Sequence, residues 1–211
     1  MDTTLLTFVT GLATAVLAFA FGFPQWFRVR RTGSVEGISL ASITNSLISD
    51  LAWMLYGFHL RDVWVITTSL VALPAVIATF VAVYRLRPSS EGMWVPVAYA
   101  SILTATALLT PVAPALFAAV IGASVLWFVL PSAVQAWNSA DVTGLAMGTW
   151  WLLIIDGLVA GAYGVLAHVG GYLVYATIAI VGSGLVLARL HWPWVPECGE
   201  CAPISGCLCP A

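Results

Sequence analysis

Residues 93–137 read MWVPVAYASILTATALLTPVAPALFAAVIGASVLWFVLPSAVQAW and contain no charged side chain. A helix crosses the roughly 30 Å hydrocarbon core of a bilayer with about 20 apolar residues. The stretch is therefore too long for one crossing and long enough for two. Pro111 and Pro114 divide it, which predicts one span over 93–110 and another over 113–137.

The composition of the whole chain is that of a membrane protein. Its 211 residues are 61% hydrophobic and 8% charged, with a mean hydropathy of +1.01. Soluble domains carry about 25% charged residues. The net charge is −2 and all seven basic residues are arginines, so no basic surface can neutralise a nucleic-acid backbone. We expect an integral membrane protein in contact with the lipid bilayer and no nucleic-acid partner.

Five further uncharged or nearly uncharged runs bring the prediction to seven transmembrane helices in an all-α membrane protein. They cover 5–27, 38–58, 63–84, 143–167 and 171–190. The first run lacks a basic leader and is too long for a signal peptide, so we expect it to be retained. Under this topology one arginine, Arg61, lies on one side, and six lie on the other: Arg28, Arg30, Arg31, Arg85, Arg87 and Arg189. The positive-inside rule then places the N-terminus outside and the C-terminus in the cytoplasm, with the plasma membrane as the expected location.

The chain carries an internal repeat with an offset of 107 residues. The matching positions are structurally special ones: Pro24 with Pro131, Gly37 with Gly144, Tyr56 with Tyr163, and Gly57 with Gly164. A unit of three helices ends on the opposite side of the membrane from its start, so a parallel second unit needs one extra crossing. The span 93–110 has no partner in the repeat and supplies that crossing.

The predicted architecture is therefore 3+1+3, with two parallel three-helix bundles and a linker helix. The expected divisions are a first three-helix repeat at 1–88, a linker helix at 89–111, a second three-helix repeat at 112–190, and a cytoplasmic cysteine-containing tail at 191–211. Parallel repeats of this kind place the substrate between the two units, near the middle of the membrane.

Three motifs resemble the PQ-loop superfamily: PQ at 24–25, TGSVEGIS at 32–39 and WMLYG at 53–57. With seven spans and a linker helix, the chain is most similar to the SWEET sugar transporters. The resemblance implies that Trp53 lines a sugar pocket, and the repeat partner of Trp53 is Ala160. The two asparagines of the SWEET pattern fall on Ser69 and Ala176, so this chain departs from the family at both positions.

One face of the helix over 38–58 is polar and includes Trp53. Ser42, Asn45, Ser49 and Trp53 recur at helical spacing on that face. Together with Ser69 and Thr149, these residues are candidates for hydrogen bonds to a polyol. The alternative is that the hydroxyls bond their own helix backbone.

Two aspartates lie inside predicted spans, where a carboxylate costs about 2.5–3.5 kcal/mol to insert. The repeat aligns Asp156 with Ser49, so Asp156 is expected on the pocket face. There it could exchange a proton, hold an ammonium group or accept hydrogen bonds from a sugar. The alternative is that Trp150, Trp151 or a hydroxyl of a neighbouring helix satisfies it. Asp50 is rotated by about 100° from the stripe, which predicts that it points toward a neighbouring helix.

Prolines and tyrosines at repeated positions are candidate hinge and gate residues. Pro24 and Pro131 each remove a backbone hydrogen bond within a span, so they are candidate hinges, with Gln25 beside the first. A static kink is the alternative. Tyr56 and Tyr163, each followed by glycine at a span end, are candidate gates or interfacial anchors.

The tail contains all four cysteines: Cys198, Cys201, Cys207 and Cys209. A cytoplasmic location disfavours disulfides, and the spacing offers enough ligands for one Zn²⁺. Lipidation or an unstructured tail are the alternatives. No other cofactor is expected.

These features favour a SWEET-like transporter that moves a small polar solute, with a sugar preferred, by alternating access and facilitated diffusion. Two alternatives stay open: a proton-coupled transporter of an amino acid or amine that uses Asp156, and a non-transporting receptor or scaffold. Catalysis is not expected, because Ser183 lies between two glycines with no intramembrane histidine to activate it. One chain holds two units and could form the pathway alone, although a homo-oligomer is possible.

Overall fold

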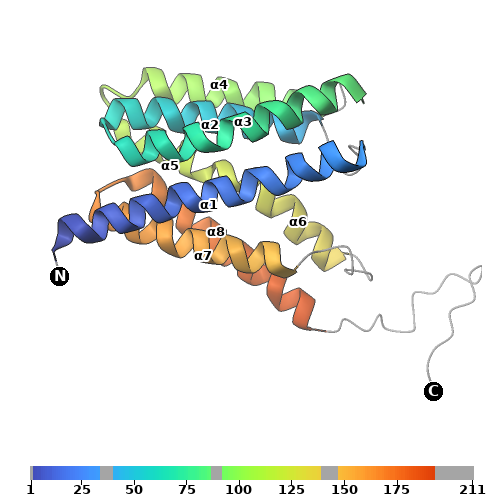
Figure 1. The fold of residues 1–211 in the computed structure, drawn as a ribbon. Helices are drawn as coiled ribbons and strands as arrows, with labels where there is room; N and C mark the ends of the chain where they lie inside the picture. The colour runs from blue at the N-terminus through green and yellow to red at the C-terminus, as the bar shows by residue number, and fades with distance from the viewer. Residues whose placement is uncertain (1, 34–39, 87–91, 139–146, 193–211) are drawn as a thin grey trace, which may run out of the picture.

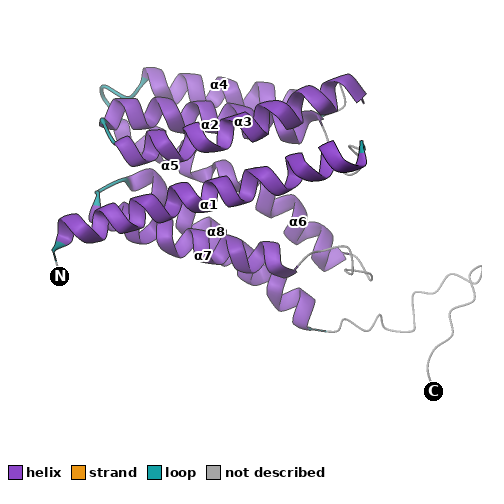
Figure 2. Ribbon diagram, viewed as in Figure 1, coloured by secondary structure: helices purple, strands orange, loops and turns teal. Residues whose placement is uncertain are grey.

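A computed structural model describes residues 2–33, 40–86, 92–138 and 147–192. Within these ranges the chain forms helices joined by turns, and no strand (Figures 1 and 2). The helices are α1 (Thr3–Thr32), α2 (Leu40–Leu60), α3 (Val63–Leu86), α4 (Trp94–Leu108), α5 (Pro114–Gly122), the 3₁₀ helix η1 (Ala123–Val125), α6 (Leu126–Asn138), α7 (Met147–Leu166) and α8 (Gly170–His191).

All seven predicted stretches are helical where the structure describes them, but 113–137 is not one continuous helix. It is divided into α5, η1 and α6. The break falls at Ala123–Val125, not at Pro131, which lies within α6. The residue before the break is Gly122, where a Cβ would lie 2.7 Å from Val174 Cβ on α8. The close approach of α5 to α8 therefore accompanies the irregular turn.

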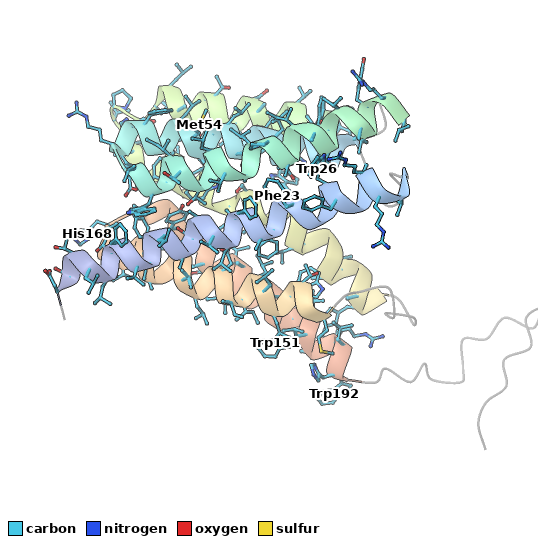
Figure 3. All side chains as sticks on the ribbon, in the orientation of Figure 1. Phe23, Trp26, Met54, Trp151, His168 and Trp192 are labelled. Carbon is cyan, nitrogen blue, oxygen red and sulfur yellow. The ribbon has the colours of Figure 1, made fainter. Side chains whose placement is uncertain are left out.

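Length and apolarity qualify four of the described helices as complete membrane crossings: Thr3–Phe21, Val63–Leu86, Met147–Leu166 and Gly170–His191. The outer surface is correspondingly apolar, with Phe8, Leu55 and Val165 more than half exposed. Trp151 and Trp192 also lie on the outside of the bundle (Figure 3). The protein is an all-α membrane protein.

The helices pack as two groups, and in each group the third helix contacts the other two. In the first group α3 contacts both α1 and α2, and in the second α8 contacts both α7 and the broken helix α5–α6. Between the groups α1 packs on α7, and α2 packs on α5 and α6. The first helix of each group thus meets the second helix of the other. Helix α4 lies against α2 and α5, and Figure 1 shows it on the far side of α2 and α3 from α7 and α8.

The turns that follow α2 and α7 have the same geometry at positions 107 residues apart. Arg61 and His168 both adopt left-handed backbone conformations, with φ of 56° and 58°. The next N–H returns to a glycine carbonyl in each turn, from Asp62 to Gly57 at 3.0 Å and from Val169 to Gly164 at 2.9 Å. These are the bonds of a Schellman helix end. The Tyr-Gly pairs matched in the sequence therefore stand at equivalent helix ends.

Gly57 allows α3 to approach α2 closely, and its replacement tests that packing. A Cβ at Gly57 would lie 2.8 Å from Ile66 Cγ1 and 2.9 Å from the Ile66 backbone nitrogen. We expect Gly57→Ala to lower the free energy of unfolding by about 1–3 kcal/mol, the usual cost of overpacking. The measurement is thermal unfolding of detergent-purified protein followed by tryptophan fluorescence. Gly148→Ala is the control, because no heavy atom lies within 4 Å of the added Cβ; equal midpoints for the two variants would contradict the proposed packing.

Candidate solute-binding site

A cavity of about 320 Å³ lies between the two helix groups. Its wall is formed by α1, α2 and α3 from one side and by η1, α6, α7 and α8 from the other. It extends from Trp53 and Tyr172 toward Ile43, near the start of α2, and Thr79, in the second half of α3. The volume is at the lower end of the range of roughly 300–1,000 Å³ found for small-molecule pockets.

Five of the six predicted substrate-binding residues line this cavity: Asn45, Ser49, Trp53, Ser69 and Asp156. Thr149 lies in the first turn of α7 and is not part of the wall. Asp50 also lines the cavity. Helix α2 therefore presents a wider face to the cavity than a single helical stripe, and the expectation that Asp50 points toward a neighbouring helix stays a prediction.

Trp53 stands at one end of the cavity, held by aromatic neighbours from both groups. Its ring stacks on that of Tyr172 on α8, with centroids 4.9 Å apart and planes at 26°. Its Nε1 donates to Ser124 Oγ of η1 at 3.3 Å. Tyr175 meets the Trp53 ring edge-on at 6.3 Å. Trp53 is thus fixed in orientation while still forming part of the wall.

Asp156 lies on α7 and is 7% exposed. The Tyr175 hydroxyl on α8 donates to its Oδ2. A hydroxyl from a neighbouring helix is one of the partners expected for Asp156, and Tyr175 supplies it. Its helix, α8, belongs to the same helix group as α7. The carboxylate accepts this bond while facing the cavity, so it keeps further acceptor capacity for a bound molecule.

Helix α4 also contributes to the site, through Tyr99. This side chain is 3% exposed and its hydroxyl accepts from Ser49 Oγ at 3.4 Å. The Tyr99 ring packs against Trp127 of α6, with centroids 5.6 Å apart. Tyr99 therefore connects α2 and α6 behind the cavity wall. Its helix, α4, takes part in the site although it has no counterpart in the sequence repeat.

The two predicted gate residues lie beyond Trp53, near the ends of α2 and α7, and both are buried. Tyr56 meets Phe117 of α5 edge-on at 5.7 Å. The Tyr163 hydroxyl lies 2.7 Å from both carboxylate oxygens of Asp62 and donates to them. Asp62 also accepts from the N–H groups of Trp64 and Val65 at the start of α3, as an N-cap does. Each tyrosine therefore contacts the other helix group.

The remaining predicted site residues are the candidate hinges and the tail cysteines. Pro24 and Gln25 lie within α1, and Pro131 lies within α6. The four cysteines of the tail lie outside the described residues. Among the described residues no group of three or more His, Cys, Asp or Glu side chains is placed to hold a metal ion.

Several site residues were missed by the sequence reasoning. Tyr172 and Tyr175 sit in an apolar helix with no polar stripe to indicate them, and Asp62 lies in a turn. The repeat offset was an unused signal, because it pairs Tyr175 with Thr68 and both line the cavity.

An apolar helical bundle that surrounds a solute-sized cavity with polar side chains in its wall can hold a small molecule within the membrane. The comparison with known families specifies the class of protein. A family model described as "Sugar efflux transporter for intercellular exchange" matches residues 5–91, which include α1, α2 and α3. The resemblance to the SWEET family is confirmed over this part of the chain. No curated protein matches the chain.

Removing the Tyr175 hydroxyl tests its hydrogen bond to Asp156. We expect Tyr175→Phe to lower the free energy of unfolding by about 1–3 kcal/mol, because a buried carboxylate oxygen loses its donor. Thermal unfolding in detergent measures the effect. Tyr84→Phe is the matched control, since that ring is 58% exposed near the end of α3. The assignment fails if the two variants unfold at the same temperature.

Proposed function

We propose that the protein moves a small polar solute, with a sugar favoured, across the membrane by alternating access and facilitated diffusion. The observation that carries the proposal is the cavity with polar side chains in its wall, between two helix groups that have the same pattern of contacts. The family match over residues 5–91 supports a sugar as the solute.

In this proposal α1–α3 and α5–α8 act as two parallel three-helix units, and α4 is the linker of a 3+1+3 architecture. The shared packing order and the matching turns after α2 and α7 support this division. Five pairs of cavity residues, each 107 positions apart, support it further: Ala18 with Val125, Ser46 with Leu153, Ser49 with Asp156, Trp53 with Ala160, and Thr68 with Tyr175. Solute exchange would then require rocking of the units, with Pro24, Gln25 and Pro131 as hinge positions.

Within the cavity, Trp53 would stack on the solute while Asn45, Ser49 and Ser69 orient it by hydrogen bonds. The aromatic contacts of Trp53 with Tyr172, and the bond from Tyr163 to Asp62, would close the path at the N-terminal end of α1. The cavity reaches toward the opposite end of the bundle. With the N-terminus outside, as the arginines favour, this arrangement would face the cytoplasm of a cell whose plasma membrane holds the protein.

Glucose equilibration in proteoliposomes tests the proposed transport. We expect wild-type protein to exchange labelled glucose without a proton gradient, and Trp53→Ala to reduce the rate at least about tenfold by removing the stacking surface. The matched control is Trp151→Ala, whose ring is half-exposed on the outer surface. Concentrative amino-acid uptake that needs a proton gradient would instead support the proton-coupled alternative, and absence of flux would favour a receptor.

Loss of the Tyr163 hydroxyl tests the proposed gate. Thr14 lines the cavity and is 2% exposed, so a Thr14→Cys side chain reports on opening in a background whose tail cysteines are replaced by serine. Tyr163→Phe removes a hydrogen bond to a charged group, a loss of about 1.5–3 kcal/mol. We expect an impermeant thiol reagent, added on the side of the N-terminus, to react on the order of tenfold faster or more. An unchanged rate, equal to that of Tyr84→Phe, would exclude this bond as a gate.

A further inference from the structure

The central cavity holds two carboxylates from opposite helix groups. Asp50 comes from α2 and Asp156 from α7, and both line the wall. None of the described residues that line the cavity is basic. A carboxylate in a low-dielectric site is retained only when a cation or a proton compensates it. The wall itself supplies no such cation, so either a proton or a cation bound in the cavity has to compensate the carboxylates.

Two residues of the cavity wall carry buried acceptor atoms without donors. Among the described residues, Asn45 Oδ1 and Asp50 Oδ2 are buried and have no hydrogen-bond partner. Asn45 is 7% exposed and lines the cavity. Buried acceptors are normally satisfied, and leaving one unpaired costs about 1–3 kcal/mol. Asn45 and Asp50 therefore have acceptor capacity that the protein does not satisfy, which favours a solute with N–H donors.

Aromatic rings complete the environment. Trp53, Tyr172 and Tyr175 all line the cavity, and the face of an aromatic ring attracts a cation. Tyr175 donates its hydroxyl to Asp156 and meets Trp53 edge-on, so carboxylate and rings form one continuous wall. Two carboxylates, an amide oxygen and aromatic rings favour an organic ammonium ion over a neutral polyol. An ammonium group carries a positive charge and three donors.

We propose that the transported solute is a sugar-sized molecule with a protonated primary amine, as in an amino sugar, and that Asp50 and Asp156 hold its ammonium group. The inference rests on the proposed function in one respect, namely that the cavity is the solute site. It assigns a substrate class to that site and a role to Asp50. The carboxylates compensate the ammonium charge, Asn45 accepts one of its donors, and Trp53 packs on the ring.

Equilibrium binding of matched sugars to protein in nanodiscs tests the proposal without requiring transport. Glucosamine, N-acetylglucosamine and glucose share a ring, and glucosamine alone carries the charge. At about pH 6.5, below the ordinary pKa range of an α-amino group, glucosamine is protonated. We expect it to bind at least about tenfold more tightly than either neutral sugar, as hydrogen bonds to charged groups imply. Equal affinities of the wild-type protein for the three sugars would overturn the proposal without any variant.

Variants then assign the preference to residues. Asp156→Asn and Asp50→Asn should each reduce the preference for glucosamine, whereas Asp156→Glu should retain part of it. Asp2→Asn is the matched control, because Asp2 is an exposed N-cap of α1 and asparagine caps equally well. Preference that survives both cavity substitutions would overturn the assignment.

Parallel flux measurements separate this proposal from the proposed function. Glucose flux without a preference for glucosamine leaves the transporter standing and overturns the ammonium site. Preferential binding of glucosamine without flux of any sugar supports the site and removes the transport function. Glucose flux that depends on a proton gradient, with no preference for glucosamine, would assign the carboxylates to protons and overturn the ammonium site.

Discussion

Lipid offers no hydrogen bonds, and this constraint separates the structural polar residues of the chain from those of the site. Hydroxyls on the outer surface bond their own helix: Thr67 donates to the Val63 carbonyl, Ser101 to Val97 and Thr177 to Leu173, each within 2.7–2.8 Å. Several cavity hydroxyls do the same, including Ser69, which donates to the Val65 carbonyl at 3.3 Å. Among the polar groups that do not satisfy themselves in this way, Asn45, Asp50 and Asp156 line the cavity, whereas Ser183 of α8 is buried outside it.

The contacts proposed to close one end of the cavity have energies that suit an exchange between two conformations. The bond from Tyr163 to Asp62 is worth about 1.5–3 kcal/mol, and the pairs of Trp53 with Tyr172 and Tyr56 with Phe117 about 0.5–1.5 kcal/mol each. Together they amount to a few kcal/mol, which is the gap between interconverting conformations. The closure is also unequal in the two halves, because the repeat partner of Asp62 is Val169, which caps α8 without a side-chain bond.

The sequence predicted most of the helices, because apolar runs of about 20 residues have few other interpretations. It did not predict the break at Ala123–Val125, which depends on the contact of Gly122 with α8, a helix some 50 residues further along the chain. The 107-residue repeat predicted Asp156 on the cavity face, whereas a single helical stripe gave no indication that Asp50 also lines the cavity. Tyr99 could not be predicted, since an aromatic residue in an apolar span has the same sequence pattern whether it faces lipid or the site, and Tyr175 was indicated only by its repeat partner Thr68.

The proposed division of the chain into two repeat units allows the cavity wall to differ between its halves. A dimer of identical three-helix units would repeat every wall residue, so a tryptophan on one side would face another on the other side. Here Trp53 is paired with Ala160, Ser49 with Asp156, and Thr68 with Tyr175. Each pair sets a large or charged side chain against a smaller or uncharged one. Asp50, whose repeat position is Gly157, follows the same rule. Fusion of the units therefore permits one carboxylate from each half at non-equivalent positions, and a symmetric dimer with either aspartate would hold two copies of it. An asymmetric pair of charges can orient a solute that has one charged end and one neutral end.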